Sequence, residues 1–155
     1  MIPDFLENGY LPEGIYDATI EEVIERFKYS NKRGKLIKGL LELIPLCISL
    51  RINILYLDGS FISERKLNPN DYDACYDTNH PDKEAVLSKV VGSPLDSDSE
   101  TQKRWFGGEI HYASTKLLHK PGSPTVLEWF RNCKEDDGKT KKGIIKLTLA
   151  QYDSK

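Results

Sequence analysis

The sequence has few cysteines and no pattern that would join them in a framework. Its three cysteines are odd in number and lie far apart, at Cys47, Cys75 and Cys133, which argues against paired disulfides and against a zinc knuckle. The three histidines show no metal-binding spacing among themselves or relative to these cysteines. We therefore expect no structural zinc, and we expect the cysteines to be small buried apolar residues.

The sequence also lacks a long apolar run. Its longest candidate, residues 36–57, is interrupted by Lys38, Glu42, Arg51 and Asn53 and falls short of the roughly 20 apolar residues that a membrane span needs. The first residues contain neither a basic leader nor an apolar export segment. We therefore expect a cytoplasmic protein without a membrane partner.

The sequence also has little net charge. Lys and Arg total 22 against 24 Asp and Glu, a formal charge of −2, which argues against a general polyanion binder that acts by bulk electrostatics. The charge is unevenly placed, since residues 1–25 contain only acidic charges and residues 26–38 only basic ones. This asymmetry indicates either a solvated pair of helices whose charges complement the helix dipoles or a surface for a partner or RNA.

Hydrophobic periodicity predicts both helices and strands in a chain of 155 residues, the length of one domain. Thr19 and Glu22 form a capping-box pattern that starts a helix over 19–29. A second helix is expected from Lys32, and Pro45 should kink or end it. The remaining expectations are strands at 52–57, 72–76, 109–114 and 144–149, helices at 61–67, 81–90 and 123–130, and a polar loop at 94–100. These elements predict an α/β (α+β) protein, helical over 1–50 and sheet-forming over 51–155.

Two aspartates stand out at the start of the expected strand at 72–76, one directly before it and one within it. Asp71 and Asp73 lie two residues apart, so in an extended chain their carboxylates project from the same face. Adjacent carboxylates repel unless a cation neutralises them, and hard oxygen ligands suit Mg²⁺. Two such ions about 4 Å apart can clamp the attacking and leaving oxygens of a phosphoryl or nucleotidyl transfer. The pair therefore indicates a magnesium site, the alternative being two exposed acids on a solvated strand.

A Gly-Ser turn precedes these aspartates. Gly59 permits close backbone approach, and the amides that follow Ser60 at the start of a helix would carry partial positive charge. This pattern indicates a small phosphate site next to the metal site. The alternative is that Ser60 only caps a helix.

Segments 57–61 (Leu-Asp-Gly-Ser-Phe) and 69–73 (Pro-Asn-Asp-Tyr-Asp) together resemble a known signature. It is the Gly-Ser, loop, Asp-x-Asp pattern of the nucleotidyltransferase superfamily typified by DNA polymerase beta. With segments 11–19 and 142–145, the chain is similar to a small group of prokaryotic and phage proteins of this fold. The resemblance implies a mixed β-sheet with helices packed on it, in a single nucleotidyltransferase-like domain over 1–155.

The resemblance also implies roles for particular residues. Asp71 and Asp73 would hold Mg²⁺, with two ions once substrate is bound, and Gly59 and Ser60 would cradle the triphosphate. A third carboxylate on a later strand completes the metal site in the family and can help to deprotonate the acceptor hydroxyl, and Glu109 is the candidate for it here, where the family usually has Asp. The alternative for Glu109 is an edge-strand acid on a solvated face.

The loop after the Gly-Ser turn departs from the family pattern. It reads Ile-Ser-Glu-Arg-Lys at 62–66, where small members often have an Ala-Arg-Gly-like run. Lys66 is our candidate for a phosphate contact, whereas Arg65 is either a second contact or solvated. Glu64 would place a negative charge near the bound phosphates.

The expected function is Mg²⁺-dependent transfer of a nucleoside monophosphate from a nucleoside triphosphate to a hydroxyl of a protein or RNA, with Asp71, Asp73 and Glu109 as the catalytic acids. Small relatives commonly act in toxin-antitoxin or phage-defence pairs, so a protein partner is also expected. The alternative is a catalytically inactive module of the same fold that binds a nucleotide, a partner protein or RNA. Trp105 and Phe106 either stack a base or belong to the core.

Overall fold

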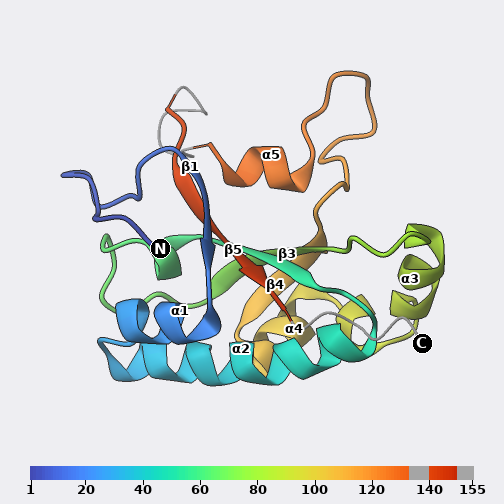
Figure 1. Ribbon diagram of the computed structural model, residues 1–155, viewed down its shortest axis with the longest axis horizontal. Coiled ribbons are helices and arrows are strands. Elements are labelled where there is room, and N and C mark those ends of the chain that lie inside the picture. The colour runs from blue at the N-terminus through green and yellow to red at the C-terminus, as the bar shows by residue number, and fades with distance from the viewer. Residues whose placement is uncertain (133–139, 150–155) are drawn as a thin grey trace.

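Five strands form a single mixed sheet in the computed structural model, which describes residues 1–132 and 140–149 (Figure 1). The strand order is β1-β5-β2-β3-β4, in which β1 pairs with β5 and β3 with β4 in parallel, whereas β2 is antiparallel to both β5 and β3. The strands are β1 Gly14–Ala18, β2 Ile54–Asp58, β3 Tyr72–Asp77, β4 Gly108–Tyr112 and β5 Gly143–Thr148. The expected α/β class with a mixed sheet is confirmed.

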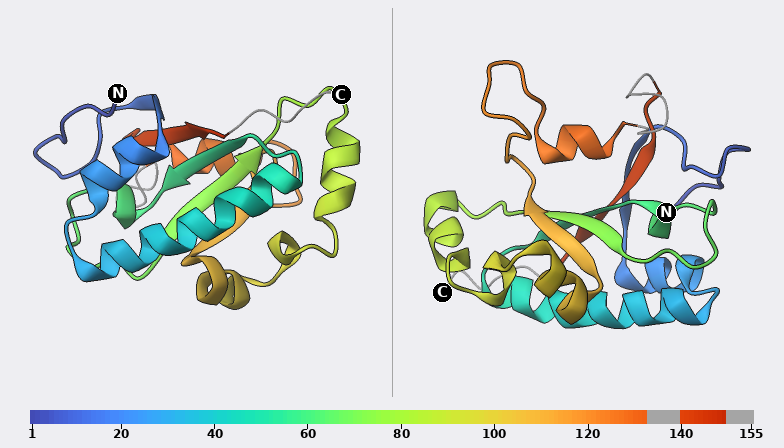
Figure 2. Two further views of the ribbon diagram at one scale, coloured as in Figure 1. Left: turned by 60° about the horizontal axis from the view of Figure 1, so that its bottom comes forward. Right: turned by 180° about the vertical axis from the view of Figure 1, so that it is seen from behind.

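Helices cover the two faces of this sheet unequally. The helices are α1 Ile20–Phe27, α2 Asn31–Ser49, α3 Lys83–Val90, α4 Ser99–Phe106 and α5 Val126–Phe130, with short 3-10 turns η1 Ser60–Ile62 and η2 Pro94–Asp96. Helices α1, α2 and α4 lie against one face, whereas α5 lies on the opposite side of the sheet from α2 (Figures 1 and 2). The main core therefore fills the space between the sheet and α1, α2 and α4.

The first helix follows the expected pattern. Thr19 accepts a hydrogen bond from the backbone amide of Glu22, and the Glu22 side chain accepts one from the backbone amide of Thr19, so the capping box is complete. Val23 and Phe27, which lie four residues apart on one side of α1, are fully buried. The reciprocal cap fixes where α1 starts, and its apolar stripe fixes which side faces the sheet.

The second helix extends beyond the proline that was expected to kink or end it. Helix α2 continues through Pro45 to Ser49, so its early end is wrong. Pro45 lies on the exposed side of α2, where water can serve the carbonyl group that loses its amide donor. The opposite side of the helix buries Leu36, Leu40 and Leu43, and this packing outweighs the loss of one helical hydrogen bond.

Four other segments differ from expectation. Strand β1 was not predicted, because a five-residue strand with one exposed side shows little periodicity. Helix α4 begins inside the expected polar loop 94–100, where Asp98 caps it through the amide of Thr101. Segment 61–67 forms only the short turn η1 in place of a helix, and α5 starts at Val126 rather than at residue 123. The capping box of Thr125 with Glu128 sets that later start.

Two of the cysteines behave as expected. Cys47 and Cys75 are free thiols with no exposed surface, and burial raises the pKa of Cys47 to about 12. Cys133 lies outside the described residues. Among the helices of the described part of the chain, none is both long and apolar enough to cross a bilayer.

Candidate functional site

A row of carboxylates crosses three neighbouring strands at one end of the sheet. Asp58 at the end of β2 pairs with Asp73 in β3, and Asp73 pairs in turn with Glu109 in β4. Residues directly paired across strands project from the same face, so the three carboxylates share the face turned away from α2. Asp71 precedes Asp73 by two residues at the start of β3 and shares that face.

A cavity of about 340 Å³ lies beside this row. Asp71 and Asp73 form its acidic side, and the Gly-Ser turn lines it as well. The cavity is completed by three basic residues and two polar ones, namely Arg65, Lys66, Lys142, Tyr10 and Ser63. The sequence assigned a catalytic or nucleotide-binding role to six residues. The cavity brings together five of them, namely Gly59, Ser60, Lys66, Asp71 and Asp73, whereas Glu109 does not line it.

Gly59 forms the tight junction between β2 and the turn η1. Its φ of +89° and ψ of −173° define a conformation that is open almost only to glycine. A Cβ atom at this position would lie 2.9 Å from Oδ2 of Asp73. Because Gly59 has no side chain, the backbone of the turn can approach Asp73 directly. The space beside Gly59 is part of the cavity.

Arg33 of α2 holds the loop that follows this turn. The side chain is fully buried, and its guanidinium donates hydrogen bonds to five backbone carbonyl groups, those of Ser60, Phe61, Ser63, Lys66 and Leu67. Burial lowers the pKa of Arg33 from its ordinary value, although the guanidinium stays charged because that value is so high. Since one cation gathers carbonyl groups from the whole loop, Arg33 fixes the shape of the cavity wall that carries Lys66.

Lys103 of α4 bridges two of the acids at the edge of the sheet. Its Nζ atom lies 3.3 Å from Oδ2 of Asp71 and 3.3 Å from Oε1 of Glu109. The hydrogen bond to Asp71 raises the pKa of Lys103 most, followed by that to Glu109. An ammonium group therefore already occupies the position where these two carboxylates attract a cation.

Glu109 is held by several neighbours outside the cavity. Ser99 donates a hydrogen bond of 2.8 Å to its Oε1 atom, and His111 lies 3.5 Å from its Oε2 atom. Burial alone would raise the pKa of Glu109, but the hydrogen bonds from Ser99 and Lys103 outweigh it and hold the pKa below its ordinary value. Glu109 is thus an acid of the edge strand β4 that is 30% exposed and is held by neighbouring side chains.

Asp58 is neutralised by a lysine that directly precedes β5. Asp58 and Lys142 form a buried ion pair, in which the side chains are 1% and 8% exposed. Lys142 also lines the cavity. Because a buried carboxylate is costly without a partner, this pair keeps one acid of the row neutralised and leaves Asp71 and Asp73 as the acids that face the cavity.

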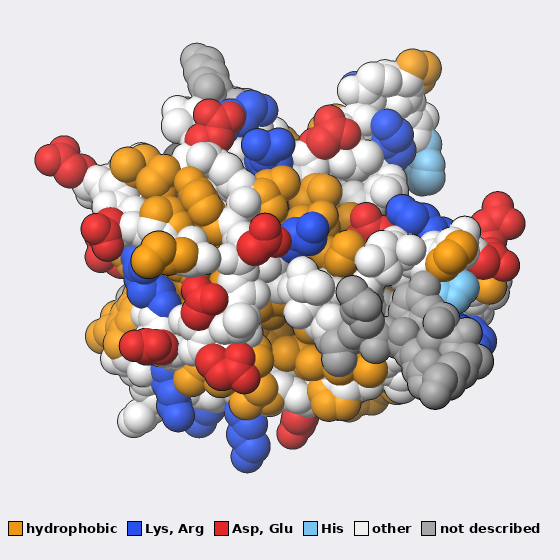
Figure 3. Space-filling model, viewed as in Figure 1, with side chains coloured by type: hydrophobic (Ala, Val, Ile, Leu, Met, Phe, Trp, Pro, Cys, Tyr) orange, Lys and Arg blue, Asp and Glu red, His pale blue; other side chains and the backbone are white. Residues whose placement is uncertain are grey.

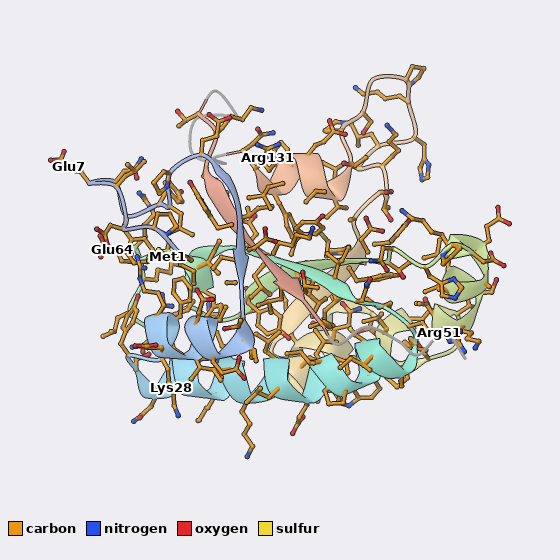
Figure 4. The ribbon with its side chains drawn as sticks, viewed as in Figure 1. Met1, Glu7, Lys28, Arg51, Glu64 and Arg131 are labelled. Carbon is orange, nitrogen blue, oxygen red and sulfur yellow. The ribbon has the colours of Figure 1, made fainter. Side chains whose placement is uncertain are left out.

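The other residues singled out from the sequence divide between the site and its surroundings. Arg65 lines the cavity, and its Cζ atom lies 4.7 Å from the centroid of the Tyr10 ring. Glu64 does not line the cavity and lies on the same side of the molecule as Met1 and Glu7 (Figure 4).

The two aromatic residues before β4 have different fates. Phe106 is buried in the core, as one of the two interpretations held, whereas the Trp105 side chain is 46% exposed. Sequence reasoning assigned no role to Arg33, Lys103 or Lys142. The Lys142-Gly143 match in the family resemblance was the single signal that pointed to one of them.

The acids fit a magnesium ion to a limited degree. Within residues 1–132 and 140–149, no three His, Cys, Asp or Glu side chains are gathered as a metal-binding group. Mg²⁺, however, is usually held by one or two carboxylates, with waters and substrate phosphates as its other ligands. Asp71 and Asp73 match that donor set, and the contact of Lys103 with Asp71 marks a position that attracts positive charge.

Comparison with known proteins gives one match. Searches of the curated proteins and of the solved structures each returned no similar protein. The model of a family of unknown function, DUF6932, matches residues 3–148, and this match includes β1 through β5 and every residue of the cavity. The chain therefore belongs to the family of unknown function DUF6932.

Proposed function

We propose that the protein is a metal-dependent nucleotidyltransferase that moves a nucleoside monophosphate from a nucleoside triphosphate to a hydroxyl of a protein or RNA, releasing pyrophosphate. One observation carries the proposal: the Asp71 and Asp73 carboxylates share a cavity with the Gly59-Ser60 turn and with basic side chains. A triphosphate needs positive charge and backbone amides along its length, and its reacting phosphorus needs a cation next to it.

The chain's own residues have distinct tasks in this proposal. Ser60 and the turn behind Gly59 receive the leaving phosphates, and Lys66 and Lys142 neutralise part of their charge. Asp71 and Asp73 hold Mg²⁺, which when bound polarises the phosphoryl group and draws together the attacking and leaving oxygens. Arg33 is a positioning residue, because it shapes the loop that carries Lys66 without lining the cavity.

Glu109 has the proposed role of a third acid at the edge of the cavity. It is paired in register with Asp73 and shares Lys103 with Asp71, so it is close to the metal-binding acids although it does not line the cavity. An ionised carboxylate in this position can accept the proton of the attacking hydroxyl. Glu109 then has to exchange its contact with Lys103 for one with the acceptor.

A transfer assay tests the proposal. Purified protein is incubated with Mg²⁺, a set of labelled nucleoside triphosphates and mixtures of protein or RNA acceptors, and pyrophosphate release and label transfer are measured. The Asp71→Asn and Asp73→Asn variants should lose both, whereas Asp77→Asn, on the same face of β3 but outside the cavity, should retain them. Nucleotidyl transfer that continues in both Asp71→Asn and Asp73→Asn would contradict the assignment of these acids as catalytic.

A second candidate function is a catalytically inactive module that binds a nucleotide, a partner protein or RNA. It is favoured by the contacts of Glu109, which Ser99 and Lys103 hold outside the cavity, so that the third acid does not face the cavity. Calorimetry combined with the pyrophosphate assay separates the two functions, because an inactive module binds a triphosphate or a partner and releases no pyrophosphate.

A further inference from the structure

Helices α2 and α4 enclose a basic groove that lies outside the cavity of the proposed site. The groove has a volume of about 270 Å³ and carries five basic side chains and one acidic one, namely Lys32, Lys35, Lys38, Lys103, Arg104 and Glu42. The two helices run side by side below the sheet (Figure 2), and Lys and Arg side chains project along the edge of the molecule where α2 runs (Figure 3). In a chain whose formal charge is −2, this concentration of positive charge is local.

The floor of the groove is built by glycine. A Cβ atom on Gly39 would lie 2.0 Å from the carbonyl oxygen of Phe106, so α2 approaches the end of α4 as closely as backbone atoms allow. Gly107, which ends α4 with a φ of +85°, also lines the groove. This close approach leaves the side chains on either side to form the walls, and Trp105, which is 46% exposed, also lines the groove.

The groove leads to the acids of the candidate site. Asn70 and Lys103 line it, Asn70 is followed directly by Asp71, and Lys103 contacts both Asp71 and Glu109. A ligand lying along α2 and α4 therefore reaches the edge of the cavity where the acids are. The groove and the cavity are lined by different residues, so both can be filled at once.

We propose that this groove binds a single-stranded RNA segment and directs one of its hydroxyls to the candidate site; the second half of this statement rests on the proposed function. The lysines at 32, 35 and 38 recur every third residue and follow one side of α2, where they can contact successive phosphates. Trp105, 46% exposed beside Arg104, offers a ring face on which a base can stack.

The same residues favour RNA over an acidic peptide and over DNA. Glu42 lies among the lysines, and an acidic peptide has no ribose hydroxyl that could offset the repulsion between this carboxylate and the negative charges of the ligand. A ribose 2′-hydroxyl can instead donate a hydrogen bond to the Glu42 carboxylate, a contact that DNA cannot make. The combination of spaced cations, an exposed ring and one acceptor therefore fits a ribonucleotide strand.

Fluorescence anisotropy with the full chain tests the groove without triphosphate or Mg²⁺. The probes are a labelled single-stranded RNA, a DNA of the same sequence and a polyglutamate peptide, each titrated at several salt concentrations. Lys35→Glu with Lys38→Glu should weaken RNA binding at least tenfold and flatten the salt dependence, since each lost phosphate contact lowers the slope by about 0.7. Lys89→Glu on α3 should leave the affinity unchanged.

Separate variants test the stacking role of Trp105 and the hydrogen-bond role of Glu42. Trp105→Ala should weaken RNA binding about fivefold or more, and Trp105→Phe should restore most of it, because the loss is one of stacking. Glu42→Leu should remove the preference for RNA over DNA. Circular dichroism of each variant checks that the fold is kept. We expect it to be kept because these side chains are exposed.

The outcomes of these titrations are separate from those of the transfer assay. RNA binding that is insensitive to the groove substitutions, or tighter binding of the peptide or the DNA than of the RNA, would overturn the groove assignment. Groove-dependent RNA binding that persists in Asp71→Asn and Asp73→Asn supports it even if no nucleotide is transferred. In that case the proposed function fails alone and the protein is an RNA-binding module.

Discussion

The ammonium group of Lys103 lies 3.3 Å from Oδ2 of Asp71, at the edge of the sheet where the candidate site begins. The same ammonium contacts Glu109, so a side chain of the protein neutralises Asp71, which the proposed function assigns to the metal, and Glu109, which it assigns to the acceptor hydroxyl. Binding of Mg²⁺ at Asp71 therefore competes with Lys103.

Removal of this lysine should strengthen metal binding. In Lys103→Gln the two acids lose their shared cation, and we expect the affinity for Mn²⁺, a spectroscopic substitute for Mg²⁺, to rise several-fold in the absence of nucleotide. Water-proton relaxation or calorimetry measures it, and Lys89→Gln is the control for loss of a surface charge. An unchanged or lower affinity in Lys103→Gln would place the metal elsewhere.

Arg33 should be required for the stability of the loop at 60–67. Arg33→Met leaves five carbonyl groups without their donor, and we expect it to lower the free energy of unfolding by about 3 kcal/mol or more. Arg33→Lys keeps the charge but lacks the planar fork, so we expect an intermediate loss. Urea unfolding measures both, with the exposed Arg104→Lys as the control. Equal stability of Arg33→Met and wild type would mean that the loop does not depend on this side chain.

Gly59 should be replaceable at the cost of backbone strain and of the position of Asp73. Gly59→Ala places a methyl group 2.9 Å from Oδ2 of Asp73, so we expect a loss of stability of about 1 to 3 kcal/mol together with loss of Mg²⁺-nucleotide binding. Gly92→Ala is a matched control, because Gly92 has a similar φ of +81° but an added Cβ there meets no atom within 4 Å. If both variants bind nucleotide equally well, contact between the turn and Asp73 is not part of the site.

Local signals predicted the elements of this fold whose ends are set by their own side chains. The capping box of Thr19 and Glu22 predicts α1 because both of its hydrogen bonds are local. Helix α4 escaped prediction because Asp98 caps it from within a run of polar residues that also resembles a loop. The helix does not end at Pro45, because burial of the opposite side of α2 is decided by tertiary packing, which no local pattern contains.

The candidate site shows the same division. Asp71 and Asp73 are two residues apart, so the shared face follows from strand geometry alone. Arg33 and Lys103 lie in runs of basic residues whose ordinary interpretation is a solvated helix face, and their contacts with residues 60–67 and with Glu109 depend on how α2 and α4 pack. The pairing of Asp58 with Lys142 joins strands that are distant in the chain, which spacing cannot predict.

The contacts of Glu109 should contribute to stability in a pH-dependent way. Hydrogen bonds hold the folded-state pKa of Glu109 below its ordinary value of 4.5, so its stabilisation is present above that value and is lost as the pH falls through the folded-state pKa. Glu109→Gln should therefore be less stable than wild type at neutral pH, and the difference should shrink on acidification below 4.5. Urea unfolding across this range measures it. A difference that grows on acidification would contradict the assigned direction.

The most direct test of the central claim is the Mg²⁺ dependence of triphosphate binding, measured by calorimetry with nonhydrolysable nucleoside triphosphates. The account predicts binding that requires Mg²⁺ and that weakens at least tenfold in Asp73→Asn, but not in Asp77→Asn. Binding of equal strength without Mg²⁺ or in Asp73→Asn, or no binding of any triphosphate, would contradict the claim that Asp71 and Asp73 hold the metal of a nucleotide site.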